Sequence, residues 1–506
     1  MSRTKNTLRN IQVAYVGQII TVLINFISRK IFIEILGAQY LGVNGLFTNI
    51  MSLLSLAELG IGSAIIYSMY KPIASDDRDH INSLLGFYRK AYYIIGSLVL
   101  ILGLILTPFL NFLTSETSNI PNIEILFLFY VFSTSSSYFF SYKRSFLIAN
   151  QKKYIDSIFH YSFYVVKVIL QVGSLLIFAN FYIYLAINLM ITVLENIVIN
   201  KKINEMYPYI KTNKKFTLHD QDKKTITKNV GALVLHKVAS IVVMGTDNIL
   251  ISKFVGLAAT GIYSNYILIT SAVNQFINII FQSLTAIIGN LAVTETKDRQ
   301  LFIFECIDYI GFWLYGFASI SLYILINPFI ALWLGNEYIL NNGIVLLIVL
   351  SFYLTGRRWS VLTYKDALGL FWYDRYKPIF ESLINLIVSV ILGLQVGLAG
   401  IIIGTIVSTI TTCFWIEPYV LFKYGFERSV KNYFKKYIIN TLYLMVVGYL
   451  TYNVTIIINL NSHMNFVASL LICLIVPNVL LFIPFFKSRY FEYAKKLLIN
   501  QIIKRK

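Results

Sequence analysis

Long apolar stretches separated by short polar breaks repeat along the whole chain. A run of about 20 apolar residues is long enough to cross the hydrocarbon core of a membrane as a helix. Breaking the runs at Gly, Pro and charge clusters predicts about fourteen such helices. Their predicted ranges are 11–35, 41–70, 84–112, 122–150, 154–178, 181–200, 226–254, 258–292, 301–334, 338–364, 376–397, 399–423, 436–457 and 464–486. The pattern therefore predicts an all-α polytopic membrane protein.

The composition agrees with this interpretation. Of the 506 residues 57% are hydrophobic and 13% charged, whereas about a quarter of a soluble domain is charged. The first apolar run is too long for a removable signal peptide and has no small-residue cleavage site, so we expect it to remain in the membrane. Cys306, Cys413 and Cys473 are far apart inside predicted helices. We interpret them as core residues, with neither disulfide nor metal-ligand spacing.

The positions of Lys and Arg predict the orientation of the chain. Nearly all of them fall in eight segments, which lie on one side of the membrane if the helices alternate. These segments are 1–10, 71–90, 143–153, 201–228, 297–299, 357–377, 423–436 and 487–506. Short cytoplasmic loops retain positive charge, so we expect a multi-pass protein of the bacterial plasma membrane with both termini in the cytoplasm. The net charge of +19 then reflects topology, and no nucleic-acid partner is expected.

An internal repeat suggests two related halves. Residues 35–47 resemble residues 254–266, and the pair Gly37 and Gly42 matches Gly256 and Gly261 at a constant spacing of 219 residues. Both copies follow the first helix of a six-helix set. The predicted domains are a first bundle over 1–200, a basic cytoplasmic linker over 201–225, a second bundle over 226–424, two further helices over 425–487 and a basic cytoplasmic tail over 488–506.

Polar residues recur at helical spacing within several apolar runs, which is typical of helices that line a hydrated cavity. The most specific stripe lies in the helix over 154–178. It consists of Asp156, His160, Tyr164, Lys167, Gln171 and Ser174. Lys167 lies about 20 Å into this helix at 1.5 Å per residue, which places it near the middle of the membrane.

Five cations lie within predicted helices, namely Arg29, Lys30, Lys167, Lys237 and Lys253. A cation in hydrocarbon requires a partner, a water-filled cavity or a function. Arg29 continues a stripe with Asn25, whereas Lys30 points about 100° away and is expected to snorkel or to pair with Glu34. Lys253 is adjacent to an exterior turn and is expected to snorkel.

We therefore predict a head-group site and a separate set of coupling candidates. The predicted head-group residues are Arg29, Lys167, Lys237, His236, Gln171 and Asn25. Asp156, Glu58 and Asp247 are candidates for proton or cation coupling, with structural ion pairing as an equal alternative. The sequence shows no metal-spaced cluster, phosphate loop or supported nucleophile. We expect neither an enzyme nor a cofactor or metal, and leave open coupling to a proton or sodium gradient.

Two stretches resemble a known family. Residues 29–62, RKIFIEILGAQYLGVNGLFTNIMSLLSLAELGIG, and 247–264, DNILISKFVGLAATGIYS, are similar to signature regions of the O-antigen and capsule repeat-unit flippases. These belong to the multidrug/oligosaccharidyl-lipid/polysaccharide exporter superfamily. The resemblance implies a V-shaped pair of six-helix bundles plus two helices, which moves undecaprenyl-pyrophosphate-linked oligosaccharides outward. It also implies that cavity cations bind the pyrophosphate, and that glycosyltransferases and a polymerase of the same pathway, together with membrane lipids, are partners.

Two other functions remain as alternatives. A drug or cation antiporter of the same fold would favour an acidic cavity, and the intramembrane Lys and Arg residues argue against it. A membrane glycan polymerase or glycosyltransferase would be expected to carry a sizeable exported loop, but all predicted exported turns are short.

Overall fold

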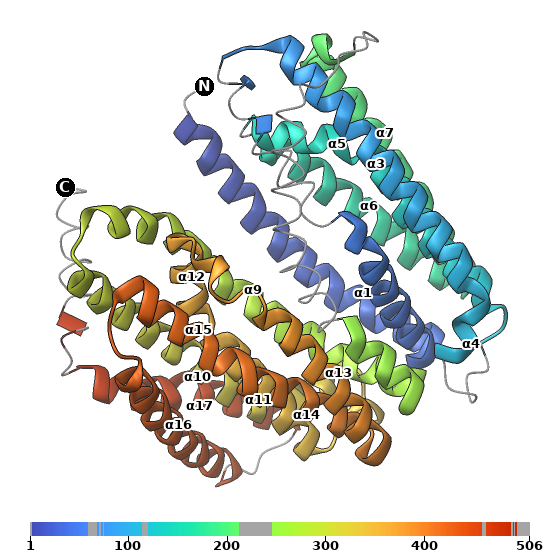
Figure 1. Cartoon of the computed structure of the whole chain (residues 1–506). Coiled ribbons are helices and arrows are strands. Elements are labelled where there is room, and N and C mark those ends of the chain that lie inside the picture. The colour runs from blue at the N-terminus through green and yellow to red at the C-terminus, as the bar shows by residue number, and fades with distance from the viewer. Residues whose placement is uncertain are drawn as a thin grey trace. The chain divides into compact units, whose positions relative to one another are not determined.

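The computed structural model describes residues 3–58, 68–69, 72–73, 75–113, 120–150, 152–211, 245–457, 462–486, 489 and 491–492. Every regular element in this part of the chain is helical (Figure 1). Nine of the described helices are long and apolar enough to span a membrane. The predicted fold class is confirmed, while the number fourteen stays a prediction.

The chain divides into two compact units, Met1–Gly261 and Ile262–Lys506. The domain limits expected from the sequence stay a prediction. The elements of the first unit are α1 (Arg3–Leu54), η1 (Ser55–Glu58), α3 (Arg78–Leu106), η2 (Thr107–Phe109), α4 (Leu110–Leu113), α5 (Ile123–Ala149), α6 (Lys153–Phe178), α7 (Phe181–Met206) and η3 (Pro208–Lys211), and residues 245–254 are also helical. Helix α5 packs against α3 and α7, and α6 packs against α1 and α7.

The backbone N–H and C=O groups at a helix end lack partners within the helix, and in an apolar environment they need other hydrogen-bond partners. Turns between these helices supply such partners. Ala179 adopts a left-handed conformation that ends α6. The Asn180 side chain then accepts hydrogen bonds from the backbone N–H groups of Tyr182 and Ile183, at 2.8 and 3.3 Å. The chain therefore reverses direction between α6 and α7 within two residues.

The two copies of the glycine repeat have the same backbone behaviour and contact each other within the first unit. Gly37 and Gly256 both have positive φ, 84° and 119°. At Gly42 a Cβ atom would lie 1.9 Å from the Leu257 carbonyl oxygen, and at Gly261 it would lie 2.1 Å from that of Ala38. The contact is reciprocal, which supports the internal repeat and explains why both positions are glycine.

The second unit contains most of α9 (Leu257–Thr294) and the rest of the described chain. Its further elements are α10 (Lys297–Trp333), η4 (Asn336–Tyr338), α11 (Asn342–Arg357), α12 (Trp359–Leu368), η5 (Leu370–Trp372), α13 (Lys377–Val396), α14 (Leu398–Ser408), the π-helical η6 (Thr409–Cys413), α15 (Phe414–Val420), the π-helical η7 (Leu421–Phe426), α16 (Lys431–Ile457) and α17 (Ser462–Phe486). Helix α10 packs against α11 and α17, and α13 packs against α14.

The cations of one basic segment of the second unit have carboxylate partners that the sequence did not predict. Residues 357–377 were counted as a cytoplasmic basic segment, and its first part lies in the predicted helix 338–364, where helices α11 and α12 are found. Arg357, Lys365 and Lys377 are buried. Each forms an ion pair with a carboxylate of the same unit. These cations lie inside the protein because each has a carboxylate partner that compensates for lost hydration.

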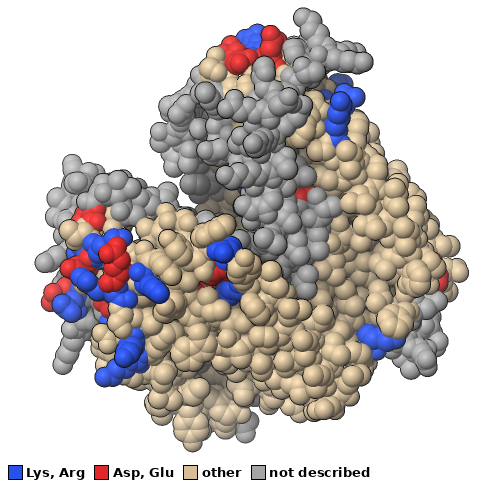
Figure 2. All heavy atoms as spheres, in the orientation of Figure 1, with Lys and Arg blue, Asp and Glu red and all other residues tan. Residues whose placement is uncertain are grey.

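The described surface is mostly uncharged. On the face shown in Figure 2, Lys, Arg, Asp and Glu gather in a few groups, and the remaining described atoms belong to uncharged residues. Large hydrophobic side chains are exposed along α3, α6, α13, α16 and α17. In water such a surface would drive aggregation, whereas lipid tails solvate it.

Candidate functional site

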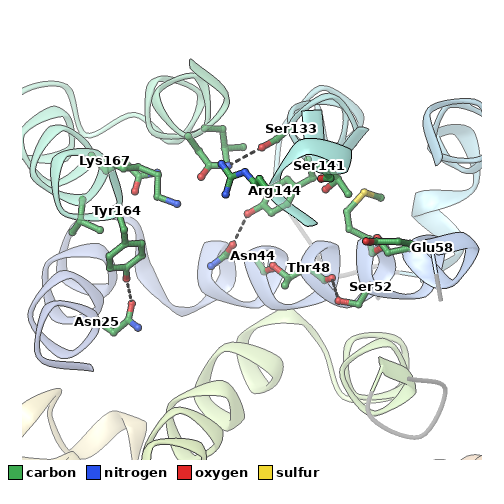
Figure 3. Close-up of a pocket in the computed structure, with 18 of the residues that line it drawn as sticks. Asn25, Asn44, Thr48, Ser52, Glu58, Ser133, Ser141, Arg144, Tyr164 and Lys167 are labelled. Carbon is green, nitrogen blue, oxygen red and sulfur yellow. Dashed lines mark hydrogen bonds between the residues drawn. The ribbon is translucent and has the colours of Figure 1, made fainter. Parts of the chain in front are cut away.

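A cavity of about 920 Å³ lies among the helices of the first unit. Its lining comes from α1, η1, α3, α5, α6 and α7, so the whole site belongs to this unit (Figure 3). Sixteen of its twenty-four lining residues are Ser, Thr, Asn, Gln or Tyr, and only four are apolar. The volume is at the upper end of the range for small-molecule sites, and the lining suits a ligand with many hydrogen-bonding groups.

Lys167 and Asn25 form one end of the cavity (Figure 3). The Tyr164 hydroxyl donates to Asn25 Oδ1 at 2.5 Å, and Lys167 Nζ lies 5.3 Å from the centre of the Tyr164 ring. Among the described residues no carboxylate lies within ion-pair distance of Lys167, although Glu195 attracts it from farther away. Arg29 is not a lining residue, but it interacts electrostatically with the lining residues Tyr164 and Tyr184. This end is therefore cationic.

The middle of the cavity is held together by hydrogen bonds between helices. Tyr130 of α5 donates to Asn44 Oδ1 of α1 at 2.5 Å. Asn188 of α7 donates to Ser133 of α5 at 3.3 Å. The buried Gln171 donates to the backbone carbonyl of Tyr184 at 3.1 Å, so its Nε2 links α6 to α7.

An ion-pair network connects α5, α6 and α7 at the cavity wall. Arg144 contacts Asp156 at 3.2 Å and Glu195 at 2.8 Å. His160 Nδ1 lies 3.3 Å from the same Glu195 carboxylate. Arg144, Asp156 and Glu195 are only 13–20% exposed, so each charge depends on its partners rather than on solvent.

Glu58 marks the opposite end of the cavity (Figure 3). The Tyr92 hydroxyl donates to Glu58 Oε1 at 3.1 Å. In the part of the chain that the structure describes, no cation lies within ion-pair distance of this carboxylate. The residues from Asn44 to Glu58 extend about 20 Å at the rise of a helix. The cavity thus has a cationic end at Lys167 and an acidic end at Glu58, while the wall between them carries neutral polar groups and the paired charges of Arg144 and Asp156.

The structure brings together most of the predicted site residues that it describes. Five of them line the cavity, namely Asn25, Lys167, Gln171, Asp156 and Glu58, while Arg29 stands beside two lining tyrosines. Asp247 is described but is not among the lining residues. His236 and Lys237 lie outside the described residues. The binding and coupling roles of all these residues stay predictions.

Two charged residues at the cavity were missed from the sequence. Arg144 was assigned to a cytoplasmic segment, because it belongs to a group of four cations at the end of a predicted helix. Glu195 lies inside the predicted helix 181–200 and was an available signal, since an acid within an apolar run requires a partner.

The other intramembrane cations have different surroundings. Lys30 pairs with Glu34 at 3.9 Å, which confirms the predicted i, i+4 contact and its separation from Arg29. Lys253 was expected to snorkel. Its Nζ lies 4.4 Å from the ring centre of Phe112, where the face of the aromatic ring attracts the charge, and the snorkelling stays a prediction.

Comparison with solved structures places this fold among known transporters. The lipid II flippase MurJ, in an inward closed conformation, is 16% identical with a TM-score of 0.64, covering 94% of this chain and 98% of that chain. An inward-facing multidrug resistance MATE family transporter of the MOP superfamily is 15% identical with a TM-score of 0.58, covering 79% and 94%. A variant of the Vibrio cholerae MATE transporter VcmN is 17% identical with a TM-score of 0.57, covering 84% and 99%.

These identities establish a shared fold and do not by themselves establish a shared substrate. No curated protein sequence matches the chain significantly. The profile of the polysaccharide biosynthesis protein family, however, matches residues 7–287. This match covers more than half of the chain, including every residue that lines the cavity. The chain therefore belongs to the polysaccharide biosynthesis protein family.

Proposed function

We propose that this protein is a flippase that moves undecaprenyl-pyrophosphate-linked oligosaccharide units across the bacterial plasma membrane by alternating access. The units would serve capsule, exopolysaccharide or other surface polysaccharide assembly. Both termini would lie in the cytoplasm, and the partners would be the lipid-linked substrate, membrane lipids, and the glycosyltransferases and polymerase of the pathway. The proposed role is transport rather than catalysis.

The observation that supports the proposal most strongly is Lys167 at a large polar cavity inside an apolar helical unit. A cation among membrane-spanning helices is costly unless a partner or ligand compensates for it. No described carboxylate lies within ion-pair distance of Lys167, and it borders about 920 Å³ of space. An anionic ligand would supply the missing partner.

The chemistry of the substrate matches this arrangement. A sugar chain with a pyrophosphate cannot enter about 30 Å of hydrocarbon without losing its hydration. The hydroxyl and amide groups of the cavity would replace water around the sugars. Lys167, together with Arg29 beside Tyr164, would compensate for the phosphate charge through charge-assisted hydrogen bonds. The lipid tail can remain in the bilayer throughout.

Cation or drug antiport is the second candidate, because Asp156 and Glu58 both line the cavity. Asp156 is already paired with Arg144 at 3.2 Å, which favours a structural role for that carboxylate. Glu58 remains as the coupling candidate. Flipping measured with and without a proton or sodium gradient separates the two functions. Substrate movement that requires no gradient would exclude antiport.

The main test uses proteoliposomes that contain the purified full-length chain and a fluorescent undecaprenyl-pyrophosphate-linked trisaccharide. Lys167→Ala and Arg29→Ala should abolish flipping, whereas Arg29→Lys should retain part of it because the charge remains. Loss of one charge-assisted contact costs roughly 1.5–3 kcal/mol, which corresponds to about a 10- to 150-fold loss of affinity.

The matched control is Lys30→Ala. Lys30 is adjacent to Arg29 in sequence, but it is exposed and paired with Glu34 outside the cavity. This variant should flip the substrate at the wild-type rate. Wild-type flipping by both alanine variants at Arg29 and Lys167 would refute the proposed head-group site.

A further inference from the structure

The direction of the hydrogen bonds along the cavity wall indicates which groups remain for a ligand. Thr48 donates its hydroxyl proton to the Asn44 carbonyl at 2.6 Å, and Ser52 donates to the Thr48 carbonyl at 3.0 Å. Ser55 donates to the Met51 carbonyl at 2.7 Å. A hydroxyl that has given its only proton to the backbone can offer only lone pairs to a ligand.

The facing wall repeats this arrangement. Ser141 of α5 lines the cavity and donates to the Ser137 carbonyl at 2.8 Å. Beyond it, Glu58 completes the row with a carboxylate, which accepts hydrogen bonds and has no proton to give when ionised. The part of the cavity from Thr48 to Glu58 is therefore rich in acceptors.

The amide groups toward the opposite end have the reverse polarity. The amide oxygens of Asn25 at the cationic end and of Asn44 in the middle are already occupied by tyrosine hydroxyls, which leaves their N–H groups as the donors. Lys167 adds a positively charged donor at the cationic end. The cavity thus changes from donors to acceptors along α1 and η1, and an elongated ligand should bind in one direction.

We propose that the acceptor-rich end, from Thr48 to Glu58, is a sugar subsite that selects glycans whose outer residues carry hydroxyl or amino donors and rejects glycans that end in a carboxylate. This inference rests on the proposed function, because it places the pyrophosphate at Lys167 and the outer sugars toward Glu58. A hydroxyl-bearing sugar satisfies the lone pairs of Thr48 and Ser52. A uronic acid would bring a second negative charge to Glu58, where no described cation lies within ion-pair distance.

The test compares two substrates that differ at a single carbon atom. The probes are undecaprenyl-pyrophosphate-linked trisaccharides ending in glucose or in glucuronic acid, together with undecaprenyl pyrophosphate without sugar. Binding is measured with the full-length protein in lipid nanodiscs at fixed ionic strength. The wild-type protein should bind the glucose-ended probe at least about ten times more tightly than the glucuronic-ended probe. A tenfold ratio of affinities corresponds to about 1.4 kcal/mol of like-charge repulsion.

Glu58→Gln should bring the two affinities to within about threefold, mainly by strengthening the glucuronic-ended probe. The matched control is Glu34→Gln, a carboxylate on the preceding helix α1 that is exposed and paired with Lys30. It should preserve the wild-type ratio. A second variant, Thr48→Val with Ser52→Ala, keeps Glu58 and should weaken both trisaccharides about threefold or more.

The sugar-free probe separates this inference from the proposed function. Undecaprenyl pyrophosphate should bind equally to the wild-type protein and to all three variants, because it does not reach the acceptor-rich end. Equal wild-type affinity for the two trisaccharides, or a ratio that survives Glu58→Gln, would overturn the sugar subsite alone. If neither the sugar-free probe nor the trisaccharides bind the wild-type protein, the proposed function itself fails.

Discussion

Charged side chains lie within the helices of both units, but their surroundings differ. In the second unit Arg358 contacts Glu417 at 2.7 Å, and Lys377 contacts the same carboxylate at 2.6 Å. The side chain of Glu417 is only 1% exposed. In the first unit Lys167 borders a cavity of about 920 Å³. Among the described residues no carboxylate lies within ion-pair distance of Lys167, and Glu195 attracts it from farther away.

The difference separates charge used for structure from charge available to a ligand. Four cations of the second unit are matched by four carboxylates: Arg357, Arg358, Lys365 and Lys377 by Asp308, Glu381, Glu417 and Asp374. A buried network that is neutral and fully paired contributes specific packing but leaves no net charge to attract a substrate. An intramembrane cation at a polar cavity keeps a positive charge that can attract an anionic substrate, so we place the binding function in the first unit.

The largest expected effect comes from opening the network of the second unit. Glu417→Gln removes the carboxylate that Arg358 and Lys377 share, leaving the mostly buried Arg358 and the buried Lys377 with Glu381 as their remaining partner. Breaking a buried ion pair costs roughly 3–5 kcal/mol. We expect a large drop in the unfolding temperature of the purified protein, measured by the loss of its monodisperse gel-filtration peak after heating.

The control for this variant is Glu305→Gln in the same unit. Glu305 pairs with Lys436, whose side chain is 50% exposed, and exposed pairs contribute only about 0–1 kcal/mol. Equal unfolding temperatures for the two variants would show that the buried network is not structural. The contrast between the two units would then no longer hold.

A smaller effect is expected at Asp156, where the first unit most resembles the second. Asp156→Asn removes one of the two carboxylates of Arg144, but Glu195 still holds the guanidinium at 2.8 Å. We expect a loss of about 1–2 kcal/mol, between the values for exposed and buried pairs. The measurement is the unfolding temperature together with the dependence of flipping on a proton gradient.

Glu195→Gln and the double variant complete a thermodynamic cycle for this network. The effects of substitutions at residues that share one partner are not additive. The double variant should therefore lose more unfolding free energy than the two single variants combined, because Arg144 loses both carboxylates. If Asp156→Asn leaves stability unchanged and removes the gradient dependence, Asp156 is a coupling residue and the structural interpretation is wrong.

How well sequence predicts these regions depends on whether the relevant neighbours lie on one helix. The stripe that contains Asp156, Lys167 and Gln171 was found because helical spacing alone places these residues on one face. Glu58 was also named from the sequence, as a coupling candidate, and it lines the same cavity. The glycine repeat was also found from spacing, and its positive φ values and reciprocal contact agree with that prediction.

The missed features all involve partners from different helices. Arg144 meets Glu195 across a separation of 51 residues, and no periodicity connects them. The buried cations over 357–377 were assigned to a cytoplasmic basic segment because the positive-inside rule counts charges without their partners. Only the tertiary packing brings Glu417 to Arg358 and Lys377, so their burial could not be predicted from the sequence.

The smallest expected change in stability is at Lys167, and it is a gain in stability rather than a loss. Lys167→Met keeps the length of the side chain and removes a cation that has no described carboxylate within ion-pair distance. Stability should stay the same or rise by up to about 1 kcal/mol, because the variant avoids the cost of holding a charge among apolar helices. Lys377→Met, in contrast, should destabilise the protein strongly, since it leaves Glu417 and Glu381 with less positive charge. Unfolding temperatures of both variants and binding of undecaprenyl pyrophosphate to Lys167→Met test the contrast. A strongly destabilised Lys167→Met would mean that this lysine is structural, whereas a stable variant that no longer binds the pyrophosphate would show that its charge serves the ligand.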